Sequence, residues 1–161
     1  VSGNGSEIYN TLKILKQEDI KTRSNGLCSV VGDGMSPLGG HLFAGITDWT
    51  VISVDPLMYD DFVETSGHSN LTCLKSKIED VTFDNNYNLI VVVSVHSHAN
   101  LNTLWNRLML FDKPMMFISI PCCNSRYQKI KSILPDYHIH DIGILSSKNE
   151  VLIWSYKISE L

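Results

Sequence analysis

Acidic residues follow three successive apolar runs in the first half of the sequence. Asp33 comes after "LCSVV" inside a glycine-bearing turn, and Asp55 follows "VISV" 22 positions later. Glu79 and Asp80 follow a third, shorter run, in "KIEDV". Glycine lets the backbone approach a ligand closely, and an acid about twenty residues beyond such a turn receives ribose hydroxyls in nucleotide-binding α/β folds. The spacing therefore predicts a nucleoside pocket in which Glu79 or Asp80 accepts a hydrogen bond from an adenine amino group.

The turn "GDGMSPLGG" connects the first apolar run to a predicted helix. Ser36 and Pro37 are the residue types of a helix cap and a first-turn proline, so we expect the helix to begin there. A helix N-terminus favours negative charge, which suits a ligand held at the turn. We assign Gly34 and Met35 of this turn to the pocket, together with Pro56 beside the second acid.

Histidines and cysteines close the fourth and fifth apolar runs, in "SVHSHANL" and "SIPCCNS". Histidine as a residue type titrates near neutral pH, so His96 is the candidate base that removes a proton from a nucleophile, and Ser94 is assigned to the ligand pocket. The alternative is that His96 only bonds to loop backbone. His98, Cys122 and Cys123 are zinc-ligand types beside it, but adjacent cysteines are not spaced as C-x-x-C, so we expect no metal.

These candidate residues need a sheet whose strands end side by side. Apolar runs alternate with helical periodicities, which predicts an α/β fold: a doubly wound, mostly parallel Rossmann-like sheet with helices on both faces and a C-terminal antiparallel hairpin. Ligands of such sheets bind beyond the carboxyl ends of the strands. The expected strands are 27–31, 49–55, a short one within 71–81, 88–95, 114–120, 137–145 and 150–158, and the expected helices are 7–17, 36–46, 100–111 and 127–134.

The order of the motifs resembles that of the class I S-adenosylmethionine-dependent methyltransferases. In that family an acidic, glycine-bearing loop follows the first strand, an acid ending the second binds ribose, and an acid after the third meets adenine. "VVGDGMSPLGG", "VISVDP" and "KIEDV" match these in order, and the resemblance covers about Leu27 to Lys157. It implies one methyltransferase-like domain over 1–161, S-adenosylmethionine as cofactor, and His96 near the transferred methyl group. Residues 1–6 are expected to be disordered or added for expression.

The P-x-G-G of the first turn resembles the P-G-G turn of RNA ribose 2′-O-methyltransferases, which suggests RNA or an RNA cap as methyl acceptor. The Lys-Asp-Lys-Glu set of those enzymes is not recognisable, since "SVHSHANL" contains no acid. Two other functions stay open. One is a catalytically inactive binding or scaffold domain of a larger polypeptide, which the short chain favours. The other is a dinucleotide-dependent oxidoreductase, against which the missing G-x-G-x-x-G and the late hairpin argue.

Composition limits the possible partners and location of the protein. The 161 residues are 43% apolar and 19% charged with a net charge of -4, which gives no overall basic footprint for nucleic acid. No apolar run reaches the ~18 residues of a membrane span. The four cysteines are not spaced as a disulfide framework, so we expect a reducing, cytoplasmic location, and we give little weight to the glycosylation sequon at Asn70–Thr72.

Overall fold

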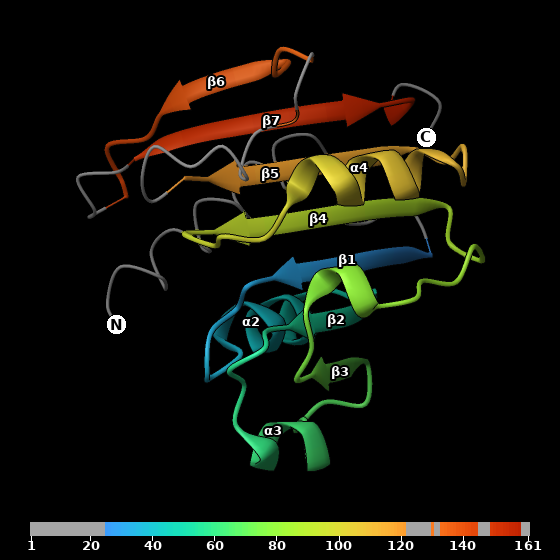
Figure 1. The fold of residues 1–161 in the computed structure, drawn as a ribbon, viewed down its shortest axis with the longest axis vertical. Coiled ribbons are helices and arrows are strands. Elements are labelled where there is room, and N and C mark those ends of the chain that lie inside the picture. Colours follow the sequence, from blue (N-terminus) through green and yellow to red (C-terminus); the bar gives the residue numbers. More distant parts are fainter. Residues whose placement is uncertain (1–24, 122–129, 131–132, 145–148, 159–161) are drawn as a thin grey trace.

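A mixed β-sheet organises the described part of the chain. The computed structural model describes residues 25–121, 130, 133–144 and 149–158, and these contain one seven-stranded sheet in the order β3-β2-β1-β4-β5-β7-β6 (Figure 1). Strands β1 to β5 run parallel, and β7 is antiparallel to both β5 and β6. The strands are β1 (Gly26–Val31), β2 (Thr50–Val54), β3 (Leu71–Leu74), β4 (Leu89–Val95), β5 (Met115–Ile120), β6 (Tyr137–His140) and β7 (Glu150–Tyr156).

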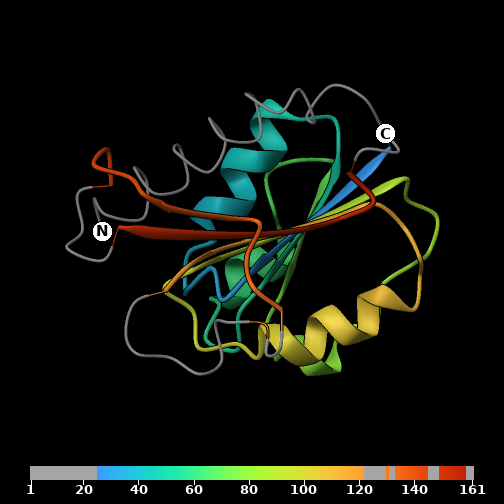
Figure 2. The same ribbon diagram turned by 90° about the horizontal axis from the view of Figure 1, so that it is seen from above.

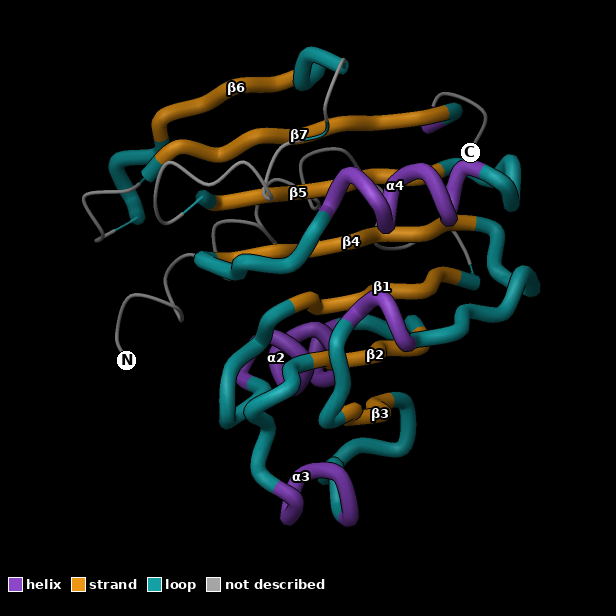
Figure 3. Tube along the Cα trace, in the orientation of Figure 1, coloured by secondary structure: helices purple, strands orange, loops and turns teal. Residues whose placement is uncertain are grey.

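Helices cover both faces of this sheet. Figure 2 shows α2 (Leu38–Ile46) on one face and α4 (Leu101–Met109) on the other. Two shorter elements, α3 (Asp60–Glu64) and the 3₁₀ turn η2 (Ile78–Asp80), flank β3 in the sequence (Figure 3). The predicted fold class, a doubly wound and mostly parallel sheet closed by an antiparallel hairpin, is confirmed.

Burial on both faces explains why the central strands are continuously apolar. Every residue of β1 and β5 is buried, as expected of parallel strands between two helical layers. Phe43 of α2 belongs to the apolar core on one face, and Trp105 of α4 packs edge-on against Phe117 on the other, with ring centroids 5.0 Å apart. Trp105, Met115 and Met116 are buried core residues.

Several element boundaries differ from the sequence prediction. Helix α2 begins at Leu38, and Pro37 occupies the cap position without a side-chain cap bond, so the prediction of Ser36 as cap is wrong. Strand β6 ends at His140, five residues early, because Asp141 folds the chain into a turn by accepting hydrogen bonds from Gly143 and Ile144. The short α3 and η2 were not predicted.

Some predictions concern other parts of the chain. The helix expected at 7–17 lies outside the described residues, as does most of the one expected at 127–134.

Among the described helices, none has both the length and the apolar character needed to cross a membrane.

We call the rim of the sheet where β1 to β5 end the carboxyl edge. It is the side toward which the arrowheads of these strands point in Figure 1. Because the five strands are parallel, the loops that follow them start at this one rim. The acid-bearing and histidine-bearing segments singled out in the sequence all begin there.

Candidate functional site

The turn after β1 is shaped by two glycines in the left-handed region. Gly32 has φ +70° and Gly34 φ +85°. A Cβ on Gly32 would lie 2.1 Å from Ser97 Oγ in the loop after β4, so glycine is required for the two loops to pack. A Cβ on Gly34 would meet no heavy atom within 4 Å. The tip of the turn is therefore open to a ligand, while its base is packed.

The Asp33 carboxylate faces inward and fastens this turn to α2 and β2. Its Oδ1 accepts from the Gly39 N–H at 2.9 Å, and its Oδ2 accepts from the Gly40 N–H and the Ser53 hydroxyl, both at 2.7 Å. Glycine is needed at both donors, because a Cβ would lie 2.7 Å from Val30 Cγ1 or 2.8 Å from Ser53 Cβ. Asp33 thus caps α2 from the preceding turn.

Burial sets the ionisation of this carboxyl group. Desolvation raises the pKa of Asp33 to about 6, although the hydrogen bonds from Ser53, Gly40 and Gly39 lower it; the nearby Asp55 raises it slightly further. The group therefore titrates in a range where most aspartates are fully ionised. Its role in the described structure is to hold the turn in place.

Asp55, at the end of β2, is hydrogen-bonded to the open turn. Its Oδ2 accepts from the Gly34 N–H at 2.9 Å, and its Oδ1 accepts from the Leu57 N–H at 2.7 Å. Asp55 is half-buried, and Met35 and Pro56 beside it are exposed. A carboxylate oxygen has two acceptor sites, so each oxygen of Asp55 retains capacity for a further donor. The structure thus brings together five of the predicted pocket residues, Asp33, Gly34, Met35, Asp55 and Pro56.

The acids after β3 project from η2 and are exposed. Glu79 and Asp80 lie in this turn, which Arg107 of α4 holds through the backbone. The Arg107 guanidinium donates to the carbonyls of Ile78 at 3.1 Å, of Glu79 at 3.3 Å, and of Val81. Arg107 is not among the residues predicted from the sequence. The available signal was an isolated cation in an otherwise apolar and neutral helix.

The loop after β4 carries the candidate base. His96 directly follows β4, has φ +51°, is half-buried, and donates its backbone N–H to the Ile120 carbonyl at the end of β5 at 2.9 Å. The contact between Ser97 and the first turn places this loop against the candidate pocket. Ser94, in contrast, lies inside β4 with its side chain fully buried. Its predicted contact with a ligand stays a prediction.

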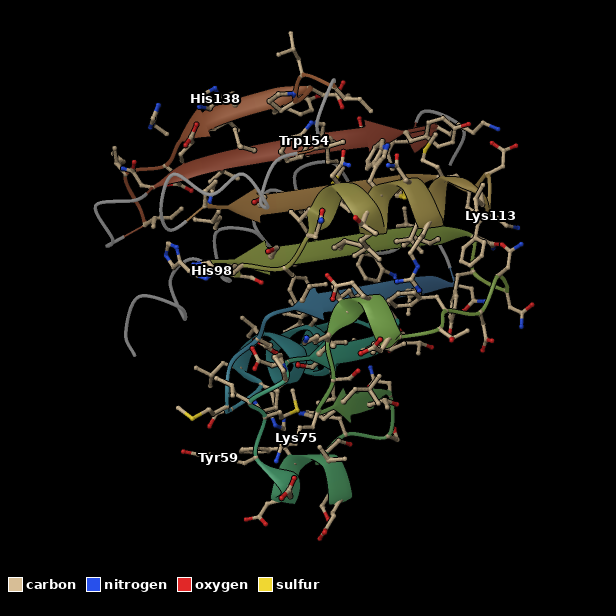
Figure 4. All side chains as sticks on the ribbon, in the orientation of Figure 1. Tyr59, Lys75, His98, Lys113, His138 and Trp154 are labelled. Carbon is tan, nitrogen blue, oxygen red and sulfur yellow. The ribbon has the colours of Figure 1, made fainter. Side chains whose placement is uncertain are left out.

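Metal-ligand types do not gather in the described residues. No group of three or more His, Cys, Asp or Glu side chains that could hold a metal occurs there, and His98 is exposed after the end of β4 (Figure 4). Cys122 and Cys123 lie outside the described residues. His138 and His140 are exposed on β6, and His138 Nε2 is 2.7 Å from Glu150 Oε1.

An open cleft lies away from the acid-bearing turns, over β6 and β7. Its volume is about 470 Å³, and Figure 4 labels two of its residues, His138 and Trp154. In the sheet order β4 and β5 separate β7 from β1, so this cleft is distinct from the glycine turn. Its lining is mainly apolar: Ile130, Ile133, Leu134, Pro135, His138, Glu150, Leu152 and Trp154.

Comparison with solved structures identifies the fold. No protein-family model matches the sequence, and no curated protein sequence matches it either. A mutant of MtNAS in complex with S-adenosylmethionine aligns over 93% of this chain and 61% of its own, with a TM-score of 0.60 and 12% identity. The N-methyltransferase NodS from Bradyrhizobium japonicum WM9 aligns over 96% and 97%, with a TM-score of 0.56 and 12% identity. The chain has the class I methyltransferase fold.

A second MtNAS structure, in complex with MTA and tNA, aligns over 92% of this chain and 59% of its own, with a TM-score of 0.56 and 12% identity. The chain thus spans about three-fifths of the length of MtNAS and nearly all of NodS. At this identity the likeness establishes the methyltransferase fold.

Proposed function

We propose that this chain is an S-adenosylmethionine-dependent methyltransferase. The observation that carries the proposal is the 2.9 Å hydrogen bond from Gly34 to Asp55, which joins an open-tipped glycine turn to the acid that ends β2. The MtNAS structure with S-adenosylmethionine and the N-methyltransferase NodS share the fold, which supports the same cofactor class here.

Residues that follow β1, β2 and β3 in the sequence suit this cofactor. Asp55 retains acceptor capacity for ribose hydroxyls, and the exposed carboxylates of Glu79 and Asp80 suit an adenine amino group. Gly34 leaves open space where backbone would approach the ligand, with Met35 next to it. Asp33 holds the turn in place through its hydrogen bonds with α2 and β2. Pro56 and Ser94 are further predicted contacts.

S-adenosylmethionine, when bound, supplies an electrophilic methyl group. The chain's part is to align the acceptor and, at His96, to take the proton that the acceptor nucleophile gives up. His96 lies at the end of β4, and its loop packs on the glycine turn through Ser97. The proposed base therefore follows β4 at the same rim of the sheet as the turns after β1 and β2.

The proposed acceptor is RNA or an RNA cap, on the likeness of Pro37-x-Gly39-Gly40 to the P-G-G turn. The structure gives Gly39 and Gly40 a packing role with Asp33, Val30 and Ser53 that any acceptor class would need. The acceptor is therefore to be identified by assaying RNA beside small amines. The buried free thiols of Cys28 and Cys73 support a reducing, cytoplasmic setting.

The first test is calorimetric titration of wild type, Asp55→Ala and Asp84→Ala with S-adenosylmethionine, S-adenosylhomocysteine and NAD. We expect the first two ligands to bind wild type with micromolar affinity. Their affinity should be at least about tenfold lower in Asp55→Ala and unchanged in the exposed-acid control Asp84→Ala. NAD should not bind. Binding of NAD alone would favour an oxidoreductase, and binding of none of the three would favour an inactive scaffold domain.

A further inference from the structure

Exposed apolar side chains gather on two neighbouring segments, which follow β1 and β2. Leu38 begins α2, whereas Leu57, Tyr59 and Val63 belong to the loop after β2 and to α3. We call these four residues the apolar patch. Their exposed fractions are 43% for Leu38, 69% for Leu57, 53% for Tyr59 and 43% for Val63. Figure 4 shows Tyr59 on the side of the molecule toward which β1 to β5 point.

Contacts between the two segments bring these side chains to one surface. The Tyr59 N–H donates to the Met35 carbonyl at 3.0 Å, which ties the loop after β2 to the turn before α2. The ring of His41 in α2 meets Phe62 of α3 edge-on, with ring centroids 5.9 Å apart. Tyr59 and Val63 are four residues apart at α3 and therefore lie on the same side of that helix. The apolar patch thus spans both segments.

Helix α3 presents this surface although it buries no residue of its own. Phe62 is its closest contact with the core, and that side chain is only half-buried. Grouped apolar side chains on a surface mark a contact site for another molecule, whereas scattered ones do not. Side chains with such large exposed fractions stand out from the surface and do not line an enclosed cavity. A macromolecule therefore suits this patch better than a small ligand does.

Acidic side chains flank the apolar patch. Residues 33–64, which contain it, include no lysine or arginine, and Asp60, Asp61 and Glu64 are exposed on α3. Lys75 after β3 pairs with Asp60 at 2.9 Å. Within the described part of the chain, no cation pairs with Asp61 or Glu64. This charge attracts a basic partner and disfavours nucleic acid, anionic lipid and a second copy of the same surface.

We propose that the apolar patch docks a basic amphipathic segment of a partner protein. Apolar side chains of that segment cover Tyr59 and Val63, and its lysines and arginines face Asp61 and Glu64. Tyrosine is a residue type that contributes strongly to affinity in interfaces, and complementary charges set the orientation of the partner. These four side chains are not among the proposed cofactor residues, so the inference does not depend on what the glycine turn binds.

Fluorescence anisotropy tests the docking with a labelled synthetic peptide of about 18 residues, in which leucine and lysine give a helix one apolar and one basic face. We expect the whole chain to bind this peptide. Tyr59→Ser with Val63→Ser should weaken binding by about tenfold or more. Asp61→Asn with Glu64→Gln should weaken it by about fivefold at low salt and reduce its dependence on ionic strength.

Tyr137→Ser with Ile139→Ser is the matched control. Both side chains are exposed on β6, at the opposite edge of the sheet from β3, and this variant should keep the wild-type affinity. The same peptide with glutamate in place of lysine should not bind. All the substituted positions are exposed, so thermal unfolding should show each variant to be folded.

The inference is overturned if the lysine peptide does not bind, or if the Tyr59→Ser, Val63→Ser variant binds it as tightly as the β6 control does. It is also overturned if polyuridine RNA or phosphatidylserine vesicles bind wild type and this variant abolishes that binding. Sedimentation that shows a dimer in wild type and a monomer in the variant would assign the patch to a second copy instead. Absence of S-adenosylmethionine binding would contradict the proposed function and leave these outcomes unchanged.

Discussion

At the scale of single residues, Asp33 makes the stability of the protein depend on pH in an uncommon direction. Burial raises its pKa to about 6, against an ordinary value of 3.8, so the native state binds the proton more tightly than the unfolded chain does. The free energy of unfolding should therefore fall by about 3 kcal/mol as pH rises from about 4 to about 6, and this contribution should be constant above that range.

Denaturant unfolding at several pH values between 4 and 7 checks this, with Asp33→Asn as the variant. Asparagine has one acceptor oxygen where aspartate has two, so this variant should be less stable than wild type at every pH. Its free energy of unfolding should not show the fall between pH 4 and 6. The control is Asp84→Asn, an exposed acid. Asp112 affects the pH dependence of stability in the opposite direction, because hydrogen bonds from Lys157 and Tyr156 lower its pKa. Its contribution is the same in wild type and in Asp33→Asn, so it cancels when the two proteins are compared. Equal pH slopes for the two proteins would contradict the assignment.

The residue scale also shows what spacing alone could predict. The positions of Asp33 and Asp55 at strand ends followed from the apolar runs before them. Their contacts did not, because Asp33 bonds to Gly39 and Gly40 only once α2 lies over the end of β2. The contacts of Arg107 reach carbonyls 26 to 29 residues away, and no periodicity in the sequence signals them.

At the scale of elements, Asn70 joins three segments. Its Nδ2 donates to the carbonyls of Ala44 at 3.1 Å, Thr47 at 3.2 Å and Trp49 at 3.0 Å, which ties the end of α2 and the start of β2 to the start of β3. The nitrogen that a glycan would use is therefore engaged with backbone. The sequon at this position is explained by a structural asparagine.

Replacing Asn70 by aspartate removes the donor and sets a carboxylate against three carbonyl oxygens. We expect the free energy of unfolding to fall by about 3 kcal/mol, measured by urea denaturation at neutral pH. Asn85→Asp makes the same chemical change at an exposed position and should stay within about 0.5 kcal/mol of wild type. A loss in Asn70→Asp no larger than in this control would show that the three contacts contribute little.

At the scale of the whole molecule, the topology was predictable and the connecting turns were not. Continuous burial of the central strands makes them apolar along their length, and alternation with helices implies parallel, right-handed crossovers. Strands β1, β4 and β5 follow that pattern clearly. The short α3 and η2 carry too few residues for a periodic signal, and their shape depends on contacts with distant elements such as α4.

In the sheet, the proposed cofactor residues and the proposed base follow different strands. The turns after β1, β2 and β3 carry the proposed cofactor residues, whereas His96 follows β4, on the other side of β1 in the sheet. His96→Ala should therefore leave the affinity for S-adenosylhomocysteine within about twofold of wild type. With an acceptor identified, it should lower kcat by about a hundredfold, because general base catalysis contributes on that order.

The pH profile distinguishes a base from a packing residue at this position. In wild type, turnover should rise with pH as the imidazole loses its proton, and in His96→Ala that rise should be absent. His98→Ala, the exposed neighbour two residues on, is the matched control and should retain both kcat and the profile. Unchanged turnover in His96→Ala at saturating cofactor would remove it as the base. A loss of kcat with the pH profile intact would assign it to the packing of the loop after β4 instead.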